Sequence, residues 1–477
     1  MTIDMRAYHV QRETVQRRWG RIIPAWPSVI AMILAVVSAN SAEAAVEKIL
    51  YAFNTMPPAG ALQVGGNPTG TLLRDASGAF YGATSLGGKY YNGTIFKLSP
   101  PANGQAEWKM SILYTFTGGY DGGSPNPVLV MDNGGAIYGS TQTGGSWLNQ
   151  GLIFKLIPPA PGGTQWTETV LHYFYYNRYE NADDGANPSG GLIMDRNGNL
   201  YGTTDLGGSI AGPSSSFGTV FKLAPLDAAR TKWQETVLYR FTGVADGQNP
   251  MNTLTLDAAG ALYGTTLYGG TGSCTDFLSN VIGCGTVFKL TPPGPAHTMW
   301  MKTTLHSFTA GADGFVPQGK LLLDAAGGIY GTTIEGGGGA CTDGLLNPVG
   351  CGIVYKLSPP SGTQTRWTET ILHSFQGPEG AYPQGGLIMD ATGALFGTTS
   401  GGGPTSYGVG GYGVLFKLTP PGYGARNWTE TALYNFNVTT SGSEAVGELI
   451  RDSGGHFFGV TYSGGPNLAG TIYEITL

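Results

Sequence analysis

The stretch GGLIMDRNGNLYGTT, residues 190–204, decides the fold, because variants of it occur seven times along the chain. A Gly-rich segment of variable length follows each variant, and then a phrase such as GTVFKL at residues 218–223. Most copies continue through a Pro-bearing turn into a Trp-led phrase, as in WQETVLYRF at residues 233–241. The Asp that ends each apolar run marks the repeats: Asp75, Asp132, Asp195, Asp257, Asp324, Asp390 and Asp452. Four short strands per repeat are typical of propeller blades, so the sequence predicts an all-β, seven-bladed β-propeller with four-stranded antiparallel blades.

The composition agrees with closely packed strands and tight turns. The chain has 477 residues, of which 79 are Gly, 41% are hydrophobic and only 12% are charged. This hydrophobic content excludes a disordered chain, which could not bury enough apolar surface. The net charge of −6 provides no basic field for a nucleic acid, so we expect no nucleic-acid partner.

The first 44 residues have a different character from the repeats. Five arginines precede an apolar run at residues 29–37, and small residues follow as far as Ala44. This order is typical of a secretory signal peptide, and the run is shorter than the roughly 20 residues of a membrane span. The sequence therefore predicts a signal peptide at 1–44 and a single propeller domain at 45–477. We expect the mature protein to be secreted, periplasmic or extracellular, monomeric and without a membrane span.

Four cysteines lie in equivalent loops of two successive repeats. Cys274 and Cys284 flank one loop, and Cys341 and Cys351 flank the next. Pairing within each loop is the simplest of the three connectivities. Zinc ribbons need closer Cys pairs or His partners, which these loops lack. The sequence predicts two disulfides, which agrees with export.

Several repeated residues have structural explanations. Each repeated Asp begins an Asp-x-x-Gly turn, which its side chain caps, so we expect turn formers rather than catalytic groups. A Lys and a Glu recur 13 residues apart, as in Lys222 and Glu235. This constant separation predicts that strands three and four pair in a fixed register, with Lys opposite Glu or close to it. The recurring Trp of strand four predicts packing between blades, and its positions are Trp108, Trp166, Trp233, Trp300, Trp367 and Trp428.

The two ends of the repeat region predict how the ring closes. The chain begins with a lone outer strand, EKILYAF at residues 47–53, and ends with TIYEITL at residues 471–477. The N-terminal strand should therefore complete the last blade. Such closure removes exposed sheet edges, which otherwise favour aggregation.

The phrases GGLIMDRNGNLYGTT, GTVFKL and WTETVLHYF resemble the Gloeo/Verruco (GloVer) tandem repeat of exported bacterial proteins. The resemblance covers about residues 47–477. It implies a propeller-like β repeat on a secreted or surface-anchored protein. Because the family has no defined biochemical role, the resemblance transfers no catalytic residue.

Variable loops predict which face of the propeller binds a ligand. The loops between strands two and three, together with the Asp-Gly loops that enter each blade, should lie on one face, and both Cys pairs fall there. Exposed aromatic groups in such loops could stack on sugar rings or anchor a protein, although packing against their own loop is the more common role of any one of them. The non-repeated candidates are Tyr90, Tyr91, Trp147, Asp205, Phe217, Asp276, Phe277, Glu335, Asp343, Tyr407 and Tyr412.

The sequence offers little support for catalysis. His172, His306 and His373 occupy one repeated strand position where other repeats have Tyr, so they are interpreted as blade residues. No nucleophile elbow, metalloprotease helix, phosphate loop or dinucleotide motif is present. The Asp-Gly loops lack the alternating acidic residues of a calcium loop. We therefore expect no metal and no cofactor.

These observations predict a binding or interaction module, with a glycan or a cell-envelope component as its partner. The alternative is a polysaccharide lyase or glycosidase with its site at the channel mouth, because propeller enzymes draw acid and base groups from different blades. A carboxylate pair near Asp205 and Glu335 would favour the alternative. Scattered acids with an aromatic patch would favour binding.

Overall fold

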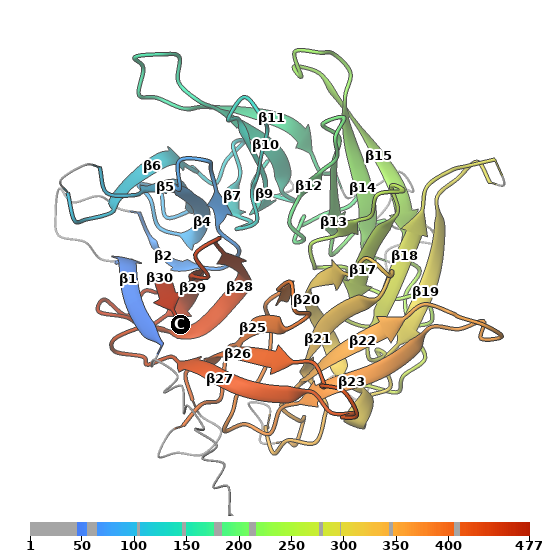
Figure 1. The fold of residues 1–477 in the computed structure, drawn as a ribbon. Helices are drawn as coiled ribbons and strands as arrows, with labels where there is room; N and C mark the ends of the chain where they lie inside the picture. Colours follow the sequence, from blue (N-terminus) through green and yellow to red (C-terminus); the bar gives the residue numbers. More distant parts are fainter. Residues whose placement is uncertain are drawn as a thin grey trace, which may run out of the picture. The chain divides into compact units, whose positions relative to one another are not determined.

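The repeats fold into seven small antiparallel sheets arranged in a ring, a seven-bladed β-propeller (Figure 1). The computed structural model describes residues 45–54, 64–102, 105–145, 149–175, 184–208, 216–275, 280–295, 297–342, 347–404 and 411–477. Residues 44–477 form one compact unit. Within the described ranges, no helix is long and apolar enough to cross a membrane.

The blades are numbered here in chain order, each from its inner to its outer strand. Blade 1 contains β2 (Gly66–Pro68), β3 (Leu73–Arg74), β4 (Phe80–Leu86), β5 (Thr94–Ser99) and β6 (Lys109–Thr115). Blade 2 contains β7 (Gly123–Pro125), β8 (Val130–Met131), β9 (Ile137–Thr143), β10 (Leu152–Ile157) and β11 (Thr167–Tyr173). Blade 3 contains β12 (Ile193–Met194), β13 (Leu200–Thr204), β14 (Thr219–Pro225) and β15 (Trp233–Arg240). Blade 4 contains β16 (Thr255–Leu256), β17 (Leu262–Thr266), β18 (Thr286–Thr291) and β19 (Met301–Ser307).

The short 3-10 helix η1 (Gly311–Asp313) precedes blade 5. Blade 5 contains β20 (Phe315–Leu323), β21 (Ile329–Glu335), β22 (Ile353–Ser358) and β23 (Thr368–Ser374). Blade 6 contains β24 (Ile388–Met389), β25 (Leu395–Thr399), β26 (Val414–Thr419) and β27 (Thr429–Asn435). Blade 7 contains β28 (Ser443–Arg451), β29 (Phe457–Ser463), β30 (Thr471–Thr476) and, as its outer strand, β1 (Val46–Ala52).

The repeated Asp residues form turns, as the sequence predicts. In blade 3, Asp195 Oδ1 accepts the backbone N–H groups of Asn197 and Asn199, both at 2.9 Å. Its other oxygen accepts the Tyr201 hydroxyl at 3.1 Å. Equivalent bonds to the backbone recur at the other six Asp residues. Each carboxylate thus fixes the turn between the first two strands of its blade.

The apolar core lies between the blades rather than within them. In the described part of the chain, buried side chains form seven clusters, and each cluster joins two neighbouring blades. In the cluster between blades 3 and 4, for example, Val220 and Phe241 pack with Leu254 and Leu262. The predicted role of the repeated Trp is also confirmed, since the Trp233 ring lies 5.9 Å from the Tyr138 ring of the preceding blade. No single blade can bury its own faces.

The fixed register of strands three and four is confirmed, but the predicted Lys–Glu pairing is wrong. In blade 3, Lys222 pairs with Thr236, while Glu235 pairs with Leu223. The same offset occurs in blades 2, 5 and 6. Because neighbouring residues of a strand point to opposite faces, Lys and Glu lie on different faces of the blade. The Lys instead covers the aromatic ring of strand two, as Lys222 does over Tyr201 at 5.9 Å.

The N-terminal strand closes the ring. β1 pairs with β30, from Val46 opposite Thr476 to Ala52 opposite Thr471. Figure 1 shows the first strand lying beside the C-terminal strands. The two predicted disulfides are present, Cys274–Cys284 and Cys341–Cys351.

Candidate functional site

The central channel begins at seven strained backbone positions, one in each blade. These residues have left-handed φ angles between 49° and 58°, and they are Asn67, Ser124, Asn187, Asn249, Val316, Tyr382 and Glu444. Such a conformation is uncommon outside Gly and is a genuine outlier for the β-branched Val316. Each costs on the order of 1–3 kcal/mol and persists only where the surroundings hold it. We call these seven residues the mouth residues.

Hydrogen bonds from the preceding blade hold the mouth residues. Each mouth N–H donates to the last carbonyl of the loop between strands two and three of that blade, at distances of 2.9 to 3.3 Å. Asn249 N–H donates to Phe217 O, Val316 N–H to Cys284 O, and Glu444 N–H to Tyr412 O. The variable loops therefore end against the channel mouth.

A Gly directly after each of these carbonyls makes the close approach possible. At Gly218 the φ angle is 93°, a conformation that side chains rarely adopt. A Cβ added there would lie 2.3 Å from Thr204 O and 2.6 Å from the Pro250 ring of the next blade. Only Gly allows the loop end, the second strand and the next blade to meet at this point.

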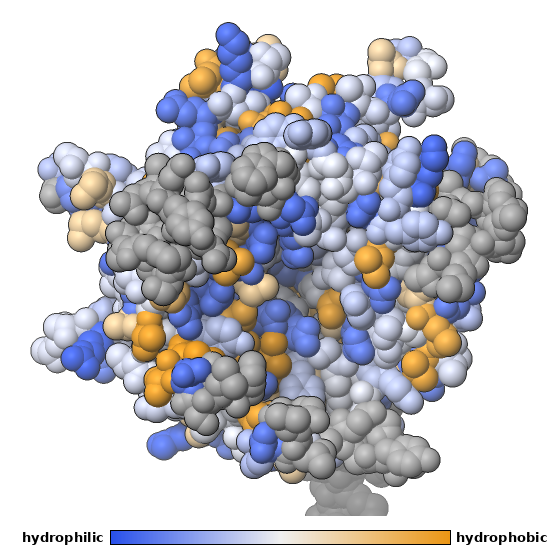
Figure 2. Space-filling model, turned by 180° about the vertical axis from the view of Figure 1, so that it is seen from behind, coloured by the Kyte–Doolittle hydropathy of each residue, from blue (hydrophilic) through white to orange (hydrophobic). Residues whose placement is uncertain are grey.

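The mouth residues Ser124, Tyr382 and Glu444 also line a cavity of about 810 Å³, to which all seven blades contribute. Hydroxyl and carboxamide groups are the most frequent kind of side chain in its lining, among them Asn126, Gln142, Ser189, Asn252, Gln318, Gln384 and Ser400. Two aromatic residues, Tyr382 and Tyr462, also line it. The volume lies within the range of about 300–1,000 Å³ that is typical of small-molecule sites. Figure 2 shows one face of the molecule, hollowed near its centre and surrounded by many hydrophilic side chains.

One ion pair spans this cavity. Lys320 Nζ of blade 5 lies 3.5 Å from Glu448 Oε2 of blade 7. Blade 6, between them, contributes Gly386, where an added Cβ would lie 2.6 Å from Glu448 Cγ. The absence of a side chain on Gly386 therefore lets Glu448 reach across blade 6. Each charge of this pair neutralises the other, which leaves Glu444 as the remaining charged side chain of the lining.

Several buried polar atoms around the cavity have no hydrogen-bond partner. They include the Ser189 hydroxyl and Gln318 Oε1, both on lining residues, and the hydroxyls of Ser140, Thr203 and Thr398 on the second strands. A buried polar atom without a partner costs roughly 1–3 kcal/mol. Because each of these atoms has almost no accessible surface, a ligand reaches them only if neighbouring side chains move.

The structure places the described sequence candidates around the mouth, but none of them lines the cavity. Phe217 and Tyr412 provide the loop-end carbonyls described above. Tyr90 and Tyr91 are exposed on the β4–β5 loop, at 45% and 69%. Trp147, Asp276, Phe277, Asp343 and Tyr407 lie outside the described residues.

Asp205 and Glu335 come from two blades that are not adjacent. Asp205 follows β13 in blade 3 and Glu335 ends β21 in blade 5, so blade 4 separates them. Burial raises the pKa of Asp205 to about 6. Its backbone carbonyl accepts the side-chain N–H of Asn249 at 3.1 Å, which fixes a mouth residue. Asp205 is therefore placed to shape the mouth.

A second set of polar groups lies between the outer strands of neighbouring blades. At the six junctions from blades 1–2 to blades 6–7, a Tyr or His of one outer strand faces a group from the entry loop and a residue from the next outer strand. Tyr114 donates to Asp121 at 3.1 Å, His172 lies 2.8 Å from Asp184, and Tyr434 donates to Glu47 at 2.9 Å. We call these groups the junction clusters.

The residue contributed by the next outer strand is usually a Glu. The five members are Glu47, Glu168, Glu235, Glu369 and Glu430, and one carboxyl oxygen of each is buried without a hydrogen-bond partner. Burial raises the pKa of Glu168, Glu430 and Glu47 to about 7 and that of Glu235 to about 8. These carboxyl groups favour a proton or another cation beside them.

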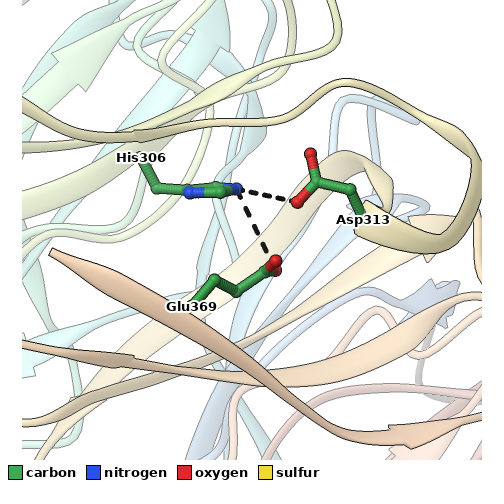
Figure 3. A group of neighbouring side chains, drawn as sticks. All are labelled: His306, Asp313 and Glu369. Atoms are coloured by element: carbon green, nitrogen blue, oxygen red, sulfur yellow. Dashed lines mark hydrogen bonds and ion pairs between the residues drawn. The ribbon is translucent and has the colours of Figure 1, made fainter.

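At one junction the ligand-type side chains converge (Figure 3). His306 Nε2 lies 3.0 Å from Asp313 Oδ1 and 3.9 Å from Glu369 Oε1. One ligand atom from each residue lies within 4.8 Å of the other two, and no other such group occurs among the described residues. The three side chains are 14–19% exposed, so water can still reach them.

A model of the Gloeobacter/Verrucomicrobia repeat matches residues 40–278 and 339–477. The chain belongs to this family. The repeat of the Gloeobacter/Verrucomicrobia family is thus the unit that forms the blades, and the predicted resemblance is confirmed. No curated protein matches the chain significantly.

Solved structures similar to this Gloeobacter/Verrucomicrobia repeat protein are remote in sequence. A luciferin-regenerating enzyme is 11% identical, with a TM-score of 0.39, over 74% of this chain and 91% of its own. A gluconolactonase from Xanthomonas campestris is 14% identical, with a TM-score of 0.34, over 75% of this chain and 98% of its own. At these values the likeness says nothing about the activity of this chain.

Sequence reasoning missed the residues that line the cavity. A signal for them was present, because they occupy the first to third positions after the repeated entry Pro, as in Ser189–Gly191 and Gln318–Lys320. The first and third of these positions vary from repeat to repeat, whereas the neighbouring strand residues vary little. Variation at a fixed position inside a repeat thus indicates candidate binding residues as well as variation in loop length does.

Proposed function

We propose that this protein is an exported binding module that holds an uncharged, hydroxyl-rich ligand, such as a glycan segment, in the mouth of its central channel. The observation that carries the proposal is the chemistry of the cavity. All seven blades contribute to one cavity, and hydroxyl and carboxamide side chains are the most frequent kind in its lining. A sugar offers many hydroxyls, which both donate and accept hydrogen bonds, and would match such a lining.

The remaining features support the same ligand class. Lys320 and Glu448 neutralise each other at 3.5 Å, so the cavity does not favour a strongly charged ligand. Tyr382 and Tyr462 provide aromatic surface at the lining. The strained mouth residues lie on a rigid ring, and rigidity before binding reduces the entropy that a ligand must overcome.

Export is supported by two observations. The chain holds two disulfides, which persist in oxidising compartments. Residues 1–44 have the basic, apolar and small-residue order of a secretory signal peptide. A cell-envelope or extracellular glycan is the ligand that such a location supplies.

A glycan-array screen of the purified protein, followed by calorimetry on the positive glycans, tests this proposal. Gln318→Met removes the carboxamide and nearly keeps the shape, so it should weaken binding by about 1–3 kcal/mol without lowering the melting temperature. The matched control is Tyr423→Ala, which changes an exposed residue of the turn between β26 and β27 and should leave the affinity unchanged. Equal affinity of Gln318→Met and wild type for every positive glycan would exclude the cavity as the site.

The same samples test the enzyme alternative. Glu444 and Glu448 are the carboxylates of the lining, and Glu448 is paired with Lys320. Incubation of the bound glycans with the protein, followed by mass analysis, should show intact chains. Cleavage that is lost in Glu444→Gln or Glu448→Gln would identify a lyase or glycosidase instead.

A further inference from the structure

We propose that His306, Asp313 and Glu369 form a binding site for a divalent transition-metal ion of the Zn²⁺ type, at the junction of blades 4 and 5. The site lies between outer strands, away from the channel, and goes beyond the proposed glycan binding. The sequence predicted no metal site, because each residue has an ordinary explanation within its own repeat. Only the fold brings the outer strands β19 and β23 and the intervening entry loop together.

The geometry suits such an ion. Bonds of about 2.0–2.2 Å to nitrogen and oxygen in a tetrahedral arrangement separate neighbouring ligand atoms by roughly 3.3 Å. The distances from His306 Nε2 to Asp313 Oδ1 and Glu369 Oε1, 3.0 and 3.9 Å, lie on either side of this value. Figure 3 shows the His306 ring and both carboxyl groups directed toward one point. Since the site is partly exposed, water can provide a fourth ligand.

The surrounding groups orient the ligands. The backbone N–H of Thr309 donates to Asp313 Oδ2 at 2.5 Å, and its hydroxyl donates to the same oxygen at 2.8 Å. This leaves Asp313 Oδ1 to face His306. Glu369 Oε1 is buried and has no hydrogen-bond partner, although it points at the same place. Supporting bonds of this kind hold ligands in metal sites.

The preceding junction shows that the fold accommodates a cation here. Between blades 3 and 4, Lys302 occupies the position equivalent to Glu369. Its ammonium group lies 2.9 Å from Asp246 Oδ1, and its side chain is only 4% exposed. The chain thus provides its own cation at that junction. At the next one it provides His and two carboxyl groups in the same places.

The ligand set selects the class of ion. Imidazole nitrogen with carboxylate oxygen suits Zn²⁺ and similar transition metals. Ca²⁺ and Mg²⁺ prefer oxygen ligands throughout, and Ca²⁺ takes six to eight of them. The site therefore discriminates against Ca²⁺.

Calorimetric titration of the tag-free, full protein with ZnCl₂, together with the visible absorption of added Co²⁺, tests the proposal. We expect saturable binding of a single Zn²⁺ per chain, a melting temperature that rises with Zn²⁺, and no response to Ca²⁺. Two variants copy residues that other junctions already contain: His306→Tyr follows Tyr239, and Glu369→Lys follows Lys302. Both should fold, and both should weaken Zn²⁺ binding by roughly 100-fold or more.

The matched control is His172→Tyr at the junction of blades 2 and 3. It removes a His of the same strand position whose ligand atoms do not converge with two carboxyl groups, so Zn²⁺ binding should be unchanged. A second variant, Thr309→Val, removes one bond to Asp313 and should weaken binding by about 10-fold. Absence of saturable Zn²⁺ binding in the wild type would overturn the proposal and leave a proton as the shared cation. Retained binding in both His306→Tyr and Glu369→Lys would place the metal elsewhere and overturn it as well.

Discussion

Two neighbouring junctions of this ring balance the charge of an entry-loop carboxylate in different ways. Between blades 3 and 4, the carboxylate of Asp246 is neutralised by the nearly buried Lys302. Between blades 4 and 5, the carboxylate of Asp313 faces His306 and a second carboxyl group, Glu369. The backbone around both clusters is the same repeat. The comparison shows that the seven-fold scaffold fixes where charge is placed, while single substitutions decide which cation balances it.

The remaining junctions fall between these two. At the junctions that use Tyr, a phenol donates to the carboxylate of the entry loop or of the next outer strand, as Tyr114 and Tyr434 do. Burial, and at Glu168 also the nearby Asp121, raises the pKa of the adjoining Glu, whereas the hydrogen bond from Tyr434 opposes the rise at Glu47. A Lys at this position removes the need for a proton. The junctions should therefore differ in pH response although their folds are alike.

The largest effect should come from removing one side of a junction altogether. Deletion of residues 46–53 removes β1, which provides Glu47 to the Tyr434 junction and covers the edge of β30. Each apolar cluster joins two blades, so an open ring exposes the cores on both sides of blade 7. We expect loss of cooperative unfolding and aggregation, measured by calorimetry and light scattering.

The control for this deletion is a chain shortened only to Ala44, which should melt like the mature protein. A protein that starts at Asn54, stays monomeric and melts at the wild-type temperature would show that the ring closes in another way.

A smaller effect should follow from removing the fixed cation. Lys302→Met keeps most of the side-chain volume but leaves Asp246 without its ammonium partner. Breaking a buried ion pair on one side costs about 3–5 kcal/mol, and part exposure of Asp246 places the expected loss at the lower end. Denaturant unfolding measures this value. Lys289→Met, on the other face of the same blade, should cost less than about 1 kcal/mol, and equal losses in the two variants would contradict a special role for Lys302.

The smallest effect should be a change in pH dependence. Burial, and then the nearby Asp184, raise the pKa of Glu235 to about 8, whereas Arg240 opposes the shift. The unfolded chain releases this proton near its ordinary pKa of 4.5, but the folded chain retains it. The contribution to stability is therefore fully present below pH 4.5 and is lost as the pH rises to about 8. Glu235→Gln should be more stable than wild type at pH 9 by on the order of 1–2 kcal/mol, with allowance for partial exposure.

Melting curves from pH 5 to pH 9 measure this difference. The variant should have the flatter profile, and Gln234→Glu on the exposed position beside it serves as a control that should leave the profile unchanged. Parallel profiles of wild type and Glu235→Gln would show that Glu235 titrates normally in the fold.

Much of the architecture could be predicted from the sequence because each repeat contains the same pattern of turn and strand residues. The Asp turns, the inter-blade Trp, the closing strand and both disulfides depend on local patterns or on simple pairing, and all are confirmed. The Lys–Glu interpretation failed because a constant separation fixes a register only up to one residue. In blade 3 the strands pair one residue away from the assumed register, with Lys222 opposite Thr236 and Glu235 opposite Leu223.

The candidate site was harder to predict, because no linear pattern records which residues meet on the axis or at a junction. Lys320 and Glu448 come from blades that are not adjacent, and they meet only because Gly386 leaves room. His306 and Glu369 look like ordinary strand residues until the outer strands are placed side by side. Both features depend on the ring, which a single repeat does not describe.

The hydrogen bonds between loop ends and mouth residues fix the position of each loop end, whatever the length of the loop. In the disulfide-bearing loops, the residues between Cys274 and Cys284 are bounded by an S–S bond, while Cys284 O still holds Val316 of the next blade. New sequence can therefore be inserted inside the loop without moving the channel wall. The ring is in this sense a display scaffold, on which recognition surfaces can be exchanged one blade at a time while the shared interior remains the same.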